Sequence, residues 1–234
     1  MIIIKKYGRL GNTMFRNCAA SILSKKFNLK VERYFGEYEL KILRPKFYKG
    51  GTIIHENKIE VKNNSNLMSI LRQTTVNSEL YLGCTCQTRQ FVLEYKQEIL
   101  NQFTLNYDQQ HKDDLFVHVR LGDCITENRV PSSEYYVQAI ERSKFNKGYI
   151  SSDTPSNELV VYLMNKFNLT LYEGTPINTI NFAKDFGSFV LSNGTFSWWM
   201  AFLSQSKSVF YPSGGPRWCG DIFVFDEWTP IEFK

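Results

Sequence analysis

The chain has 234 residues, which is enough for one large domain or two smaller ones with cores of their own. Hydrophobic residues make up 43% and charged residues 22%, a composition that excludes an intrinsically disordered protein. The net charge is +5, but no basic run is longer than the pairs Lys5-Lys6 and Lys25-Lys26, so we expect no nucleic-acid partner. This mild excess fits either an anionic small-molecule substrate or ordinary solvated surface charge.

The start of the chain and the cysteines bear on its compartment. Three apolar residues, Ile2–Ile4, precede the first basic pair, and the longest apolar run is Trp198–Leu203, so we expect neither a signal peptide nor a membrane-spanning helix. Of the five cysteines only Cys84 and Cys86 lie close together, at a spacing typical of neither a zinc finger nor a redox motif. We therefore expect a cytoplasmic protein with reduced thiols and no stable membrane insertion. The sequence does not indicate an oligomeric state.

Residues 1–105 begin with the pattern of a βαβ unit and are expected to form an N-terminal α/β domain. Ile2–Ile4 predicts a buried strand, Gly8–Asn12 a glycine-bounded loop, and apolar spacing of three and four over residues 14–27 an amphipathic helix. The later elements predicted here are short pieces and loops over 33–64, a helix over 67–71, a strand over 80–82 and helical structure over 91–103.

Residues 106–114 are the most polar stretch and predict a linker to a C-terminal domain, residues 115–234. There, strand-like runs alternate regularly with helical patterns. The strands are expected at 115–119, 149–151, 169–172, 189–191 and 209–211, and the helices near 132–144, 156–167, 178–186 and 195–205. Ser132 and Ser133 suit the cap of the first helix and Pro155 the start of the second. This alternation predicts a parallel, doubly wound sheet, whose ligands bind at the carboxyl ends of the strands.

The first of three polar strand ends is His118–Asp123. Arg120 offers a planar fork of donors suited to a diphosphate, and Gly122 lets the backbone turn beside it. The alternative is an Arg–Asp ion pair that closes the turn. Asp123 suits either a general base or a bracing role for Arg120.

The other two strand ends also allow two interpretations. Asp153 either caps the helix that follows it or accepts hydrogen bonds from a ribose or a purine. Ser192, Asn193, Gly194, Thr195 and Ser197 lie between a strand and a helix N-terminus, where backbone N–H groups bind anions, or they merely begin a capped helix with Trp198 and Trp199 in the core.

The chain resembles the α-1,2-fucosyltransferases, which form glycosyltransferase family eleven. Gly8–Phe15 resembles the family's opening Gly-Gly/Arg-Leu-Gly-Asn-Gln-Met-Phe, and Gly83–Gln87 resembles its Gly-Tyr-Phe-Gln segment. His118–Asp123 is similar to His-Val-Arg-Arg-Gly-Asp, and Leu191–Trp199 is similar to Leu-Ser-Asn-Ser-Ser-Phe-Ser-Trp-Trp. Ser151–Asp153 stands in the place of Ser-Asp-Asp. These blocks extend over most of the chain.

The resemblance implies a GT-B architecture, in which two Rossmann-like domains face a cleft and the C-terminal one binds the nucleotide sugar. It implies an inverting, metal-independent transfer of L-fucose from GDP-fucose to a hydroxyl of a glycan acceptor, in α-1,2 linkage, without a cofactor. The family's phosphate-holding Arg maps onto Arg120. Three departures are Thr13 for Gln, Leu121 for a second Arg and Gly194 for Ser, and the chain is short in its acceptor-facing half.

The residues themselves argue against other chemistries. The sequence has no Asp-x-Asp, its three histidines (55, 111 and 118) lack metal-ligand spacing, and it contains neither a Walker A nor a dinucleotide-binding glycine motif. A diphosphate leaving group would then be neutralised by Arg120 and the N–H groups of the 192–197 turn.

Two rival functions and one further interpretation remain open at this point. The rivals are a transferase for another nucleotide deoxyhexose, and an inactive sugar-binding relative, which Leu121 and the short N-terminal half would favour. Arg9, Gly11 and Asn12 have no apolar role, which predicts that the opening loop contacts donor or acceptor across the cleft; the alternative is a purely structural turn.

Overall fold

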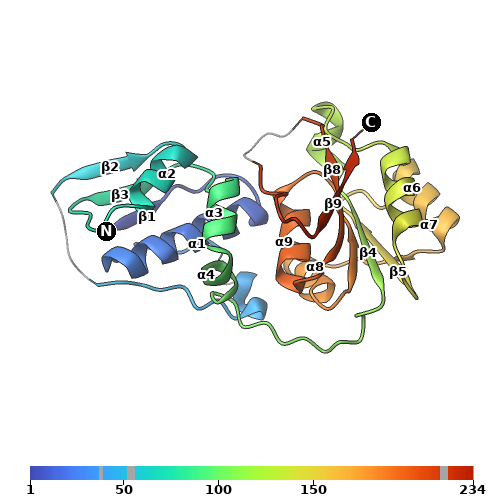
Figure 1. The fold of residues 1–234 in the computed structure, drawn as a ribbon, viewed down its shortest axis with the longest axis horizontal. Coiled ribbons are helices and arrows are strands. Elements are labelled where there is room, and N and C mark those ends of the chain that lie inside the picture. The colour runs from blue at the N-terminus through green and yellow to red at the C-terminus, as the bar shows by residue number, and fades with distance from the viewer. Residues whose placement is uncertain (37–38, 52–55, 217–220, 234) are drawn as a thin grey trace. The chain divides into compact units, whose positions relative to one another are not determined.

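A computed structural model describes residues 1–36, 39–51, 56–216 and 221–233, which form two compact units (Figure 1). The first unit comprises Met1–Leu105 together with Asp221 and Ile222, and the second comprises most of the chain from Asn106 onward. The predicted linker, residues 106–114, belongs to the second unit, where the Tyr107 hydroxyl donates to the carbonyl of Leu203 over 2.7 Å.

The first unit is built on a parallel sheet with the order β1-β3-β2. Its strands are β1 (Ile2–Ile4), β3 (Glu79–Leu82) and β2 (Lys58–Val61), and Ile3 and Glu60 both pair with Tyr81. The strand predicted at Ile2–Ile4 and that at 80–82 are therefore present. β2 was not predicted, because its alternating exposed residues carry little hydrophobic signal at a sheet edge.

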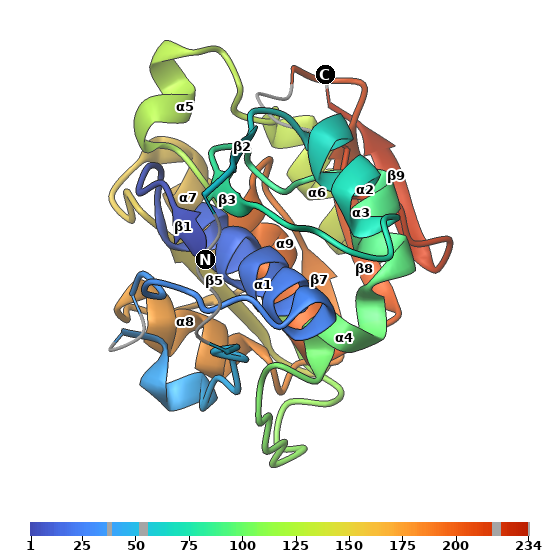
Figure 2. The ribbon, with the colours of Figure 1, turned by 90° about the vertical axis from the view of Figure 1, so that its left-hand side faces the viewer.

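Helix α1 (Leu10–Phe27) lies next to β1 (Figure 2). It was predicted as amphipathic, but nearly all of its residues from Gly11 to Ser24 are buried. Two of its buried polar side chains are bonded to loop backbone: Asn17 Nδ2 donates to Phe35 O over 2.7 Å, and Ser21 Oγ accepts from Tyr48 N over 2.8 Å. These partners allow a helix with polar residues on several sides to be enclosed.

The remaining helices of the first unit are short. They are the 3₁₀ helix η1 (Glu39–Leu43) and the α-helices α2 (Asn64–Leu71), α3 (Arg89–Glu94) and α4 (Lys96–Leu100). The helical pattern over 91–103 is therefore two helices separated at Tyr95, the first capped by Thr88.

The second unit contains a six-stranded sheet of parallel strands among its described residues. The order is β6 (Thr170–Leu171), β5 (Gly148–Ser152), β4 (Leu115–Val119), β7 (Ser188–Val190), β8 (Ser208–Ser213) and β9 (Trp228–Glu232). Helices α6 (Ser133–Arg142) and α7 (Glu158–Phe167) lie on one side, and α8 (Pro176–Ala183) and α9 (Thr195–Ser204) on the other (Figure 1). The doubly wound parallel sheet predicted from the sequence is confirmed.

Three local predictions for this unit were incomplete or wrong. β9 was missed because Pro230 interrupts its strand pattern, yet proline is tolerated at a sheet edge, where β9 lies. The five-residue helix α5 (Gly122–Thr126) was also missed. Ser132 caps α6 as predicted, whereas α7 begins at Glu158 and is capped by Asn157, so Pro155 lies before the helix.

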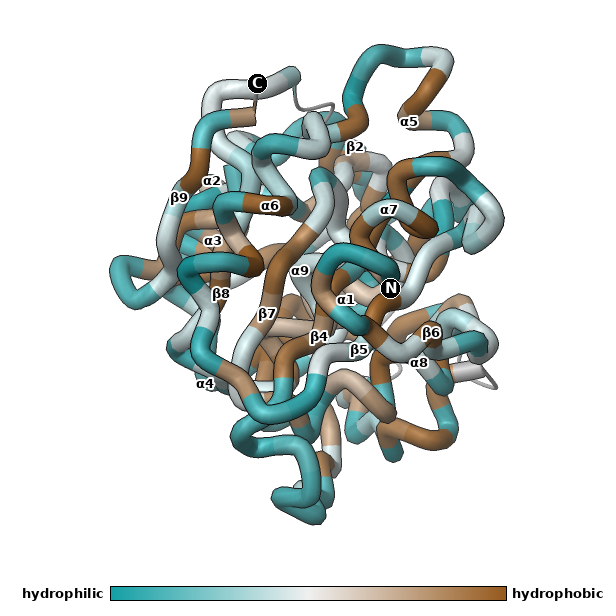
Figure 3. The backbone as a smooth tube through the Cα atoms, turned by 90° about the vertical axis from the view of Figure 1, so that its right-hand side faces the viewer, coloured by the Kyte–Doolittle hydropathy of each residue, from teal (hydrophilic) through white to brown (hydrophobic). Residues whose placement is uncertain are grey.

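The core of the second unit surrounds β4, all five of whose residues are buried. Leu115, Val117 and Val119 pack in one cluster with residues of α6 and α7, including Tyr135 and Tyr136. Figure 3 shows hydrophobic colour gathered on the strands of the sheet, while the loops that connect elements are largely hydrophilic. The buried strand holds the polar residues that follow it in a defined place.

Candidate functional site

The strand order of the second unit places one position in its sheet at a change of direction. From β4 the chain proceeds to β5 and β6 on one side, and it then returns to β7, β8 and β9 on the other. The carboxyl ends of β4 and β7 are therefore neighbours at a topological switch point, where ligands of open α/β sheets bind. The polar residues predicted from the sequence follow β4, β5 and β7 and so lie along this edge.

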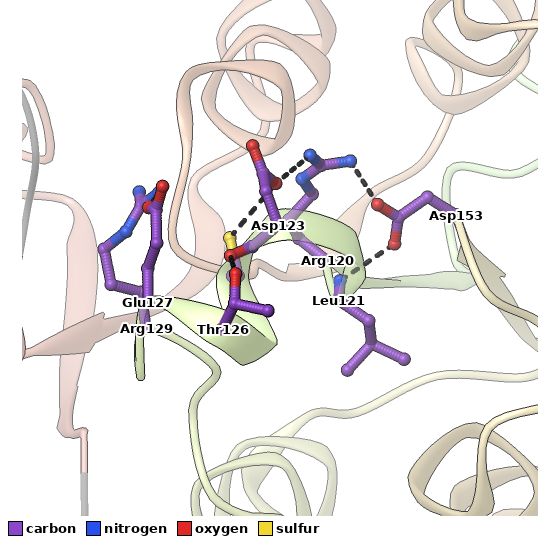
Figure 4. A network of polar contacts seen from close by, with 8 residues as sticks. Arg120, Leu121, Asp123, Thr126, Glu127, Arg129 and Asp153 are labelled. Carbon is purple, nitrogen blue, oxygen red and sulfur yellow. Dashed lines mark hydrogen bonds and ion pairs between the residues drawn. The ribbon is translucent and has the colours of Figure 1, made fainter.

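Arg120, Asp123 and Asp153 form one network at this edge (Figure 4). The Nη1 atom of Arg120 donates to Asp153 Oδ2 and its Nη2 atom donates to Asp123 Oδ1. The other oxygen of Asp153 accepts from the Leu121 N–H over 2.8 Å. A Cβ at Gly122 would lie 2.7 Å from Asp153 Oδ2, which explains a glycine between Leu121 and Asp123.

The two carboxylates control the charge of this network. Burial alone would lower the pKa of Arg120, but the attraction of Asp123 and Asp153 is stronger, so the pKa of Arg120 is raised. Burial of Asp123 is likewise outweighed by the Arg120 guanidinium, which lowers the pKa of that carboxyl. Arg120 and Asp123 are therefore both charged near neutral pH.

These contacts decide one of the alternatives left open by the sequence. Asp153 does not cap the following helix, because Asn157 does so by accepting from Leu159 N. That interpretation was wrong, and Asp153 instead holds Arg120 and the Leu121 amide. The ion pair considered for Arg120 is present, and it involves two carboxylates. Asp123 has the more exposed side chain, at 45% against 28% for Asp153.

His118 and Ser197 form a buried contact between two elements that carry the site. His118 Nδ1 lies 2.6 Å from Ser197 Oγ, and both residues are buried. Burial lowers the pKa of His118 to about 4, only partly opposed by Asp153, so the imidazole is neutral near pH 7. The contact joins the end of β4 to the first turn of α9.

The segment from Ser192 to Thr195 joins β7 to α9. Gly194 is the N-cap residue and has no side-chain cap, and a Cβ added to it would have no described atom within 4 Å. Asn193 Nδ2 donates to Pro216 O over 2.7 Å, which fixes the turn. Thr195 is buried, as are the two tryptophans that follow it. The N-terminus of α9 is thus open at Gly194, a geometry that suits an anion.

Two hydroxyls near this edge lack partners within the described part of the chain. They are Ser192 Oγ and Tyr136 Oη, both buried, and they lie beside each other without hydrogen-bond geometry. Tyr136 was missed by sequence reasoning because it follows the apolar periodicity of α6. Nothing in that local pattern distinguishes it from its neighbour Tyr135.

In the first unit, the opening loop is held by its own network. Arg9 is the exposed N-cap residue of α1, whereas Gly11 and Asn12 are buried. Asn12 Oδ1 accepts from Gln87 Nε2 over 2.9 Å, which ties the first turn of α1 to the loop after β3. Gly8, at φ +74, makes room for the Asn12 side chain. Asn12 therefore has at least a structural role.

The described residues contain neither a metal-binding cluster nor a membrane-spanning helix. Across residues 1–36, 39–51, 56–216 and 221–233, no group of three or more His, Cys, Asp and Glu side chains has an arrangement that could hold a metal ion. His55 lies outside the described residues. No helix in the described ranges is both long and apolar enough to cross a bilayer.

Two solved structures resemble the chain in fold. One is the NodZ α-1,6-fucosyltransferase soaked with GDP-fucose, with a TM-score of 0.52 and 9% identity over 86% of this chain and 92% of that one. The other is the E. coli heptosyltransferase WaaC with ADP, with a TM-score of 0.50 and 10% identity over 99% of this chain and 92% of that one. Both have the GT-B fold, so the predicted fold class is confirmed.

The sequence itself places the chain in a family. No curated protein sequence matches it. The model of glycosyl transferase family 11 matches residues 24–212, a range that includes Arg120, Asp153 and the 192–197 turn but begins after the Gly8–Phe15 motif. The protein is thus a glycosyltransferase, acting on a nucleotide sugar and a glycan acceptor, and it belongs to glycosyl transferase family 11.

Proposed function

We propose that the protein transfers L-fucose from GDP-fucose to a hydroxyl of a glycan acceptor, in α-1,2 linkage and with inversion at the anomeric carbon. The observation that carries the proposal is the gathering of Arg120, its two carboxylates and the open N-terminus of α9 at the switch point of the sheet. The membership of family 11 supports the sugar, and the GDP-fucose soaked into the NodZ structure supports the donor.

The leaving group is a diphosphate, and Arg120 is the residue proposed to take up its charge. Its guanidinium is engaged by Asp123 and Asp153, so a phosphate has to replace one of them. Asp123 is the one to yield, because it is the more exposed and lacks the second bond that Asp153 makes to Leu121 N. Asp153 then continues to orient Arg120.

This exchange gives Asp123 a second role. Arg120 lowers the pKa of Asp123 while the two are paired, and releasing the pair makes the carboxylate a better base. The acceptor hydroxyl attacks the anomeric carbon as the bond to the diphosphate oxygen breaks, and its proton passes to Asp123. The transition state resembles an oxocarbenium ion, and the departing charge is met by Arg120 and the helix N-terminus.

Leu121 does not weaken this proposal. Its side chain is buried in the core of the second unit, and its backbone N–H is the group that bonds Asp153. Residue 121 thus contributes to the network through its backbone N–H, and a second arginine side chain is not needed for that bond. Metal independence is part of the proposal and rests on the missing Asp-x-Asp of the sequence and on the family resemblance.

The cytoplasm is the proposed compartment. The support for it is that Cys18, Cys84, Cys86 and Cys124 are all free thiols.

The test is a transfer assay with GDP-fucose and a panel of glycan acceptors, run with excess EDTA and separately with added Mg²⁺ or Mn²⁺. We expect turnover in EDTA, with the product linkage assigned by NMR. Activity that disappears in EDTA and returns with metal would disprove metal independence. Turnover of UDP- or dTDP-sugars, with none of GDP-fucose, would show another donor. Binding without turnover of any donor would identify an inactive relative.

A further inference from the structure

Two buried hydroxyls at the switch point have no hydrogen-bond partner in the described part of the protein. Tyr136 projects from α6 and is fully buried, and Ser192 follows β7 with the same burial. The two hydroxyls lie beside each other, and Tyr136 is within electrostatic reach of Asp153. Burying a hydroxyl without a partner is unfavourable, because its bonds to water are lost and not replaced, so each case calls for a reason.

The neighbouring residue shows that the fold can satisfy a tyrosine at this place. Tyr135 is equally buried on the same helix, yet its hydroxyl donates to Leu191 O over 2.6 Å and is 3.3 Å from Phe210 O. Those carbonyls lie at the end of β7 and in β8. A tyrosine buried between α6 and the sheet can therefore find a hydrogen-bond partner, as Tyr135 does, so the lack of one at Tyr136 is specific to that position.

The chemistry of the Tyr136 and Ser192 hydroxyls indicates which kind of ligand atom they would bind. Burial raises the pKa of Tyr136, so its hydroxyl stays neutral and can donate, as the Ser192 hydroxyl can. Two adjacent O–H donors suit a single acceptor oxygen that carries negative charge. Gly194, two residues after Ser192, caps the positive end of α9 and faces open space among the described residues.

We infer that the Tyr136 and Ser192 hydroxyls bind an oxygen of the donor's diphosphate, as a second contact beside Arg120. The inference rests on the proposed function, because it takes the ligand to be a nucleoside diphosphate. Both residues are fully buried, so binding of the oxygen requires the side chains that cover them to move. The competing explanation is a structural water that bridges the two hydroxyls.

The experiment compares Tyr136→Phe and Ser192→Ala with Tyr135→Phe as the matched control. GDP and guanosine affinities are measured by calorimetry, and stability by urea denaturation. We expect Tyr136→Phe to weaken GDP binding about 10-fold or more, with guanosine affinity unchanged, because a bond to a charged oxygen is lost. Its urea midpoint should equal or exceed that of the wild type, because an unpaired hydroxyl is removed.

The control is expected to behave in the opposite way. Tyr135→Phe removes a satisfied hydroxyl, so its urea midpoint should fall while GDP affinity is retained. In the double variant Tyr136→Phe/Ser192→Ala, the two losses of GDP affinity should be less than additive if both hydroxyls bind one oxygen.

The outcomes separate this inference from the proposed function. Equal GDP affinity of Tyr136→Phe and the wild type would overturn the inference alone, and a lower urea midpoint in that variant would identify a structural water. If the wild type binds UDP or dTDP instead of GDP, the donor assignment fails and the same comparison is made with that nucleotide. A wild type that binds none of the three would overturn both proposals.

Discussion

At the scale of single residues, Arg120 is held by two carboxylates from different parts of the chain. Asp123 lies three residues away and Asp153 thirty-three. Bridging two carboxylates through separate Nη atoms depends on the planar fork of a guanidinium, which a lysine ammonium does not reproduce. The identity of the residue, and not only its charge, is therefore what the site requires.

Arg120→Lys should lower turnover by about 10²-fold or more, on the scale of a lost charge-stabilising donor. The measurement is kcat with GDP-fucose, together with a urea melt to show that the variant is folded. Arg142→Lys is the matched control, because Arg142 packs over the ring of Phe210 and not at the strand end. Near-normal turnover in a folded Arg120→Lys protein would refute the assignment.

His118 makes the stability of the protein depend on pH in a defined direction. Its pKa is about 4 when folded, against about 6.5 for an ordinary histidine. As the pH falls below about 6.5, His118 therefore becomes protonated in the unfolded chain but stays neutral in the folded protein. The contribution of His118 to the free energy of unfolding is fully present above pH 6.5 and is lost progressively as the pH falls to about 4. The total loss amounts to about 3 kcal/mol.

The check is a series of urea melts between pH 7 and pH 4 for the wild type and His118→Gln. The difference between the two proteins isolates this residue from the other titrating groups. We expect the slope of unfolding free energy with pH to be smaller in the variant. Parallel slopes would show that His118 titrates normally.

At the scale of elements, the β7–α9 junction provides a helix N-terminus that no side chain caps within the described residues. Gly194→Val and Gly194→Ala both place a Cβ at a residue with φ +158, so they share the backbone cost and differ in bulk. We expect Val to weaken GDP binding more than Ala, because the larger side chain fills the space that the anion needs. Calorimetry with GDP measures the difference, and equal affinities would argue against this site.

The junction after β1 depends on a pair of amides. Asn12→Ala removes the acceptor of Gln87 Nε2 and leaves a fully buried amide unpaired, which should destabilise the protein by about 1–3 kcal/mol. Transfer to the acceptor should fall while GDP affinity is retained, because the nucleotide is proposed to bind the second unit.

The double variant Asn12→Ala/Gln87→Leu is the control for this pair. It removes both polar partners and should recover part of the lost stability, as judged by urea denaturation. No change in stability or transfer in Asn12→Ala would reduce the opening loop to a simple turn.

At the scale of the whole molecule, the proposed donor-binding residues and the opening loop belong to different units. Arg120, Asp153 and the α9 N-terminus belong to the second unit, and Arg9, Gly11 and Asn12 to the first. A nucleotide that binds the folded protein and not the unfolded chain stabilises it by mass action. GDP at 100 times its dissociation constant should add about 2.7 kcal/mol and raise the melting temperature by several degrees.

A thermal-shift panel of GDP, UDP, dTDP and NADH measures this effect. We expect the largest shift with GDP and a much smaller one in Arg120→Lys. A larger shift with UDP or dTDP would identify a different donor nucleotide, and a shift with NADH alone would contradict the assignment to glycosyl transfer.

Much of the fold could be predicted from the sequence, because strands and helices are indicated by the spacing of apolar residues within short segments. The buried apolar run 115–119 predicts β4, the helical spacing near 132–144 predicts α6, and their alternation with later elements predicts a parallel sheet. The short polar motifs after the strands could be placed at the carboxyl edge for the same reason. β2 was missed because its exposed residues carry little hydrophobic signal, and β9 because Pro230 interrupts its strand pattern.

What the sequence by itself determined is the residue chemistry available at each strand end, together with the order of strands and helices. Which strand ends become neighbours is decided by the tertiary structure, through the order β5-β4-β7. Only this order brings Asp153 onto Arg120 instead of a helix cap, and Tyr136 beside Ser192. The physical reason is that local periodicity depends on a few adjacent residues, whereas these contacts depend on long-range strand pairing and burial.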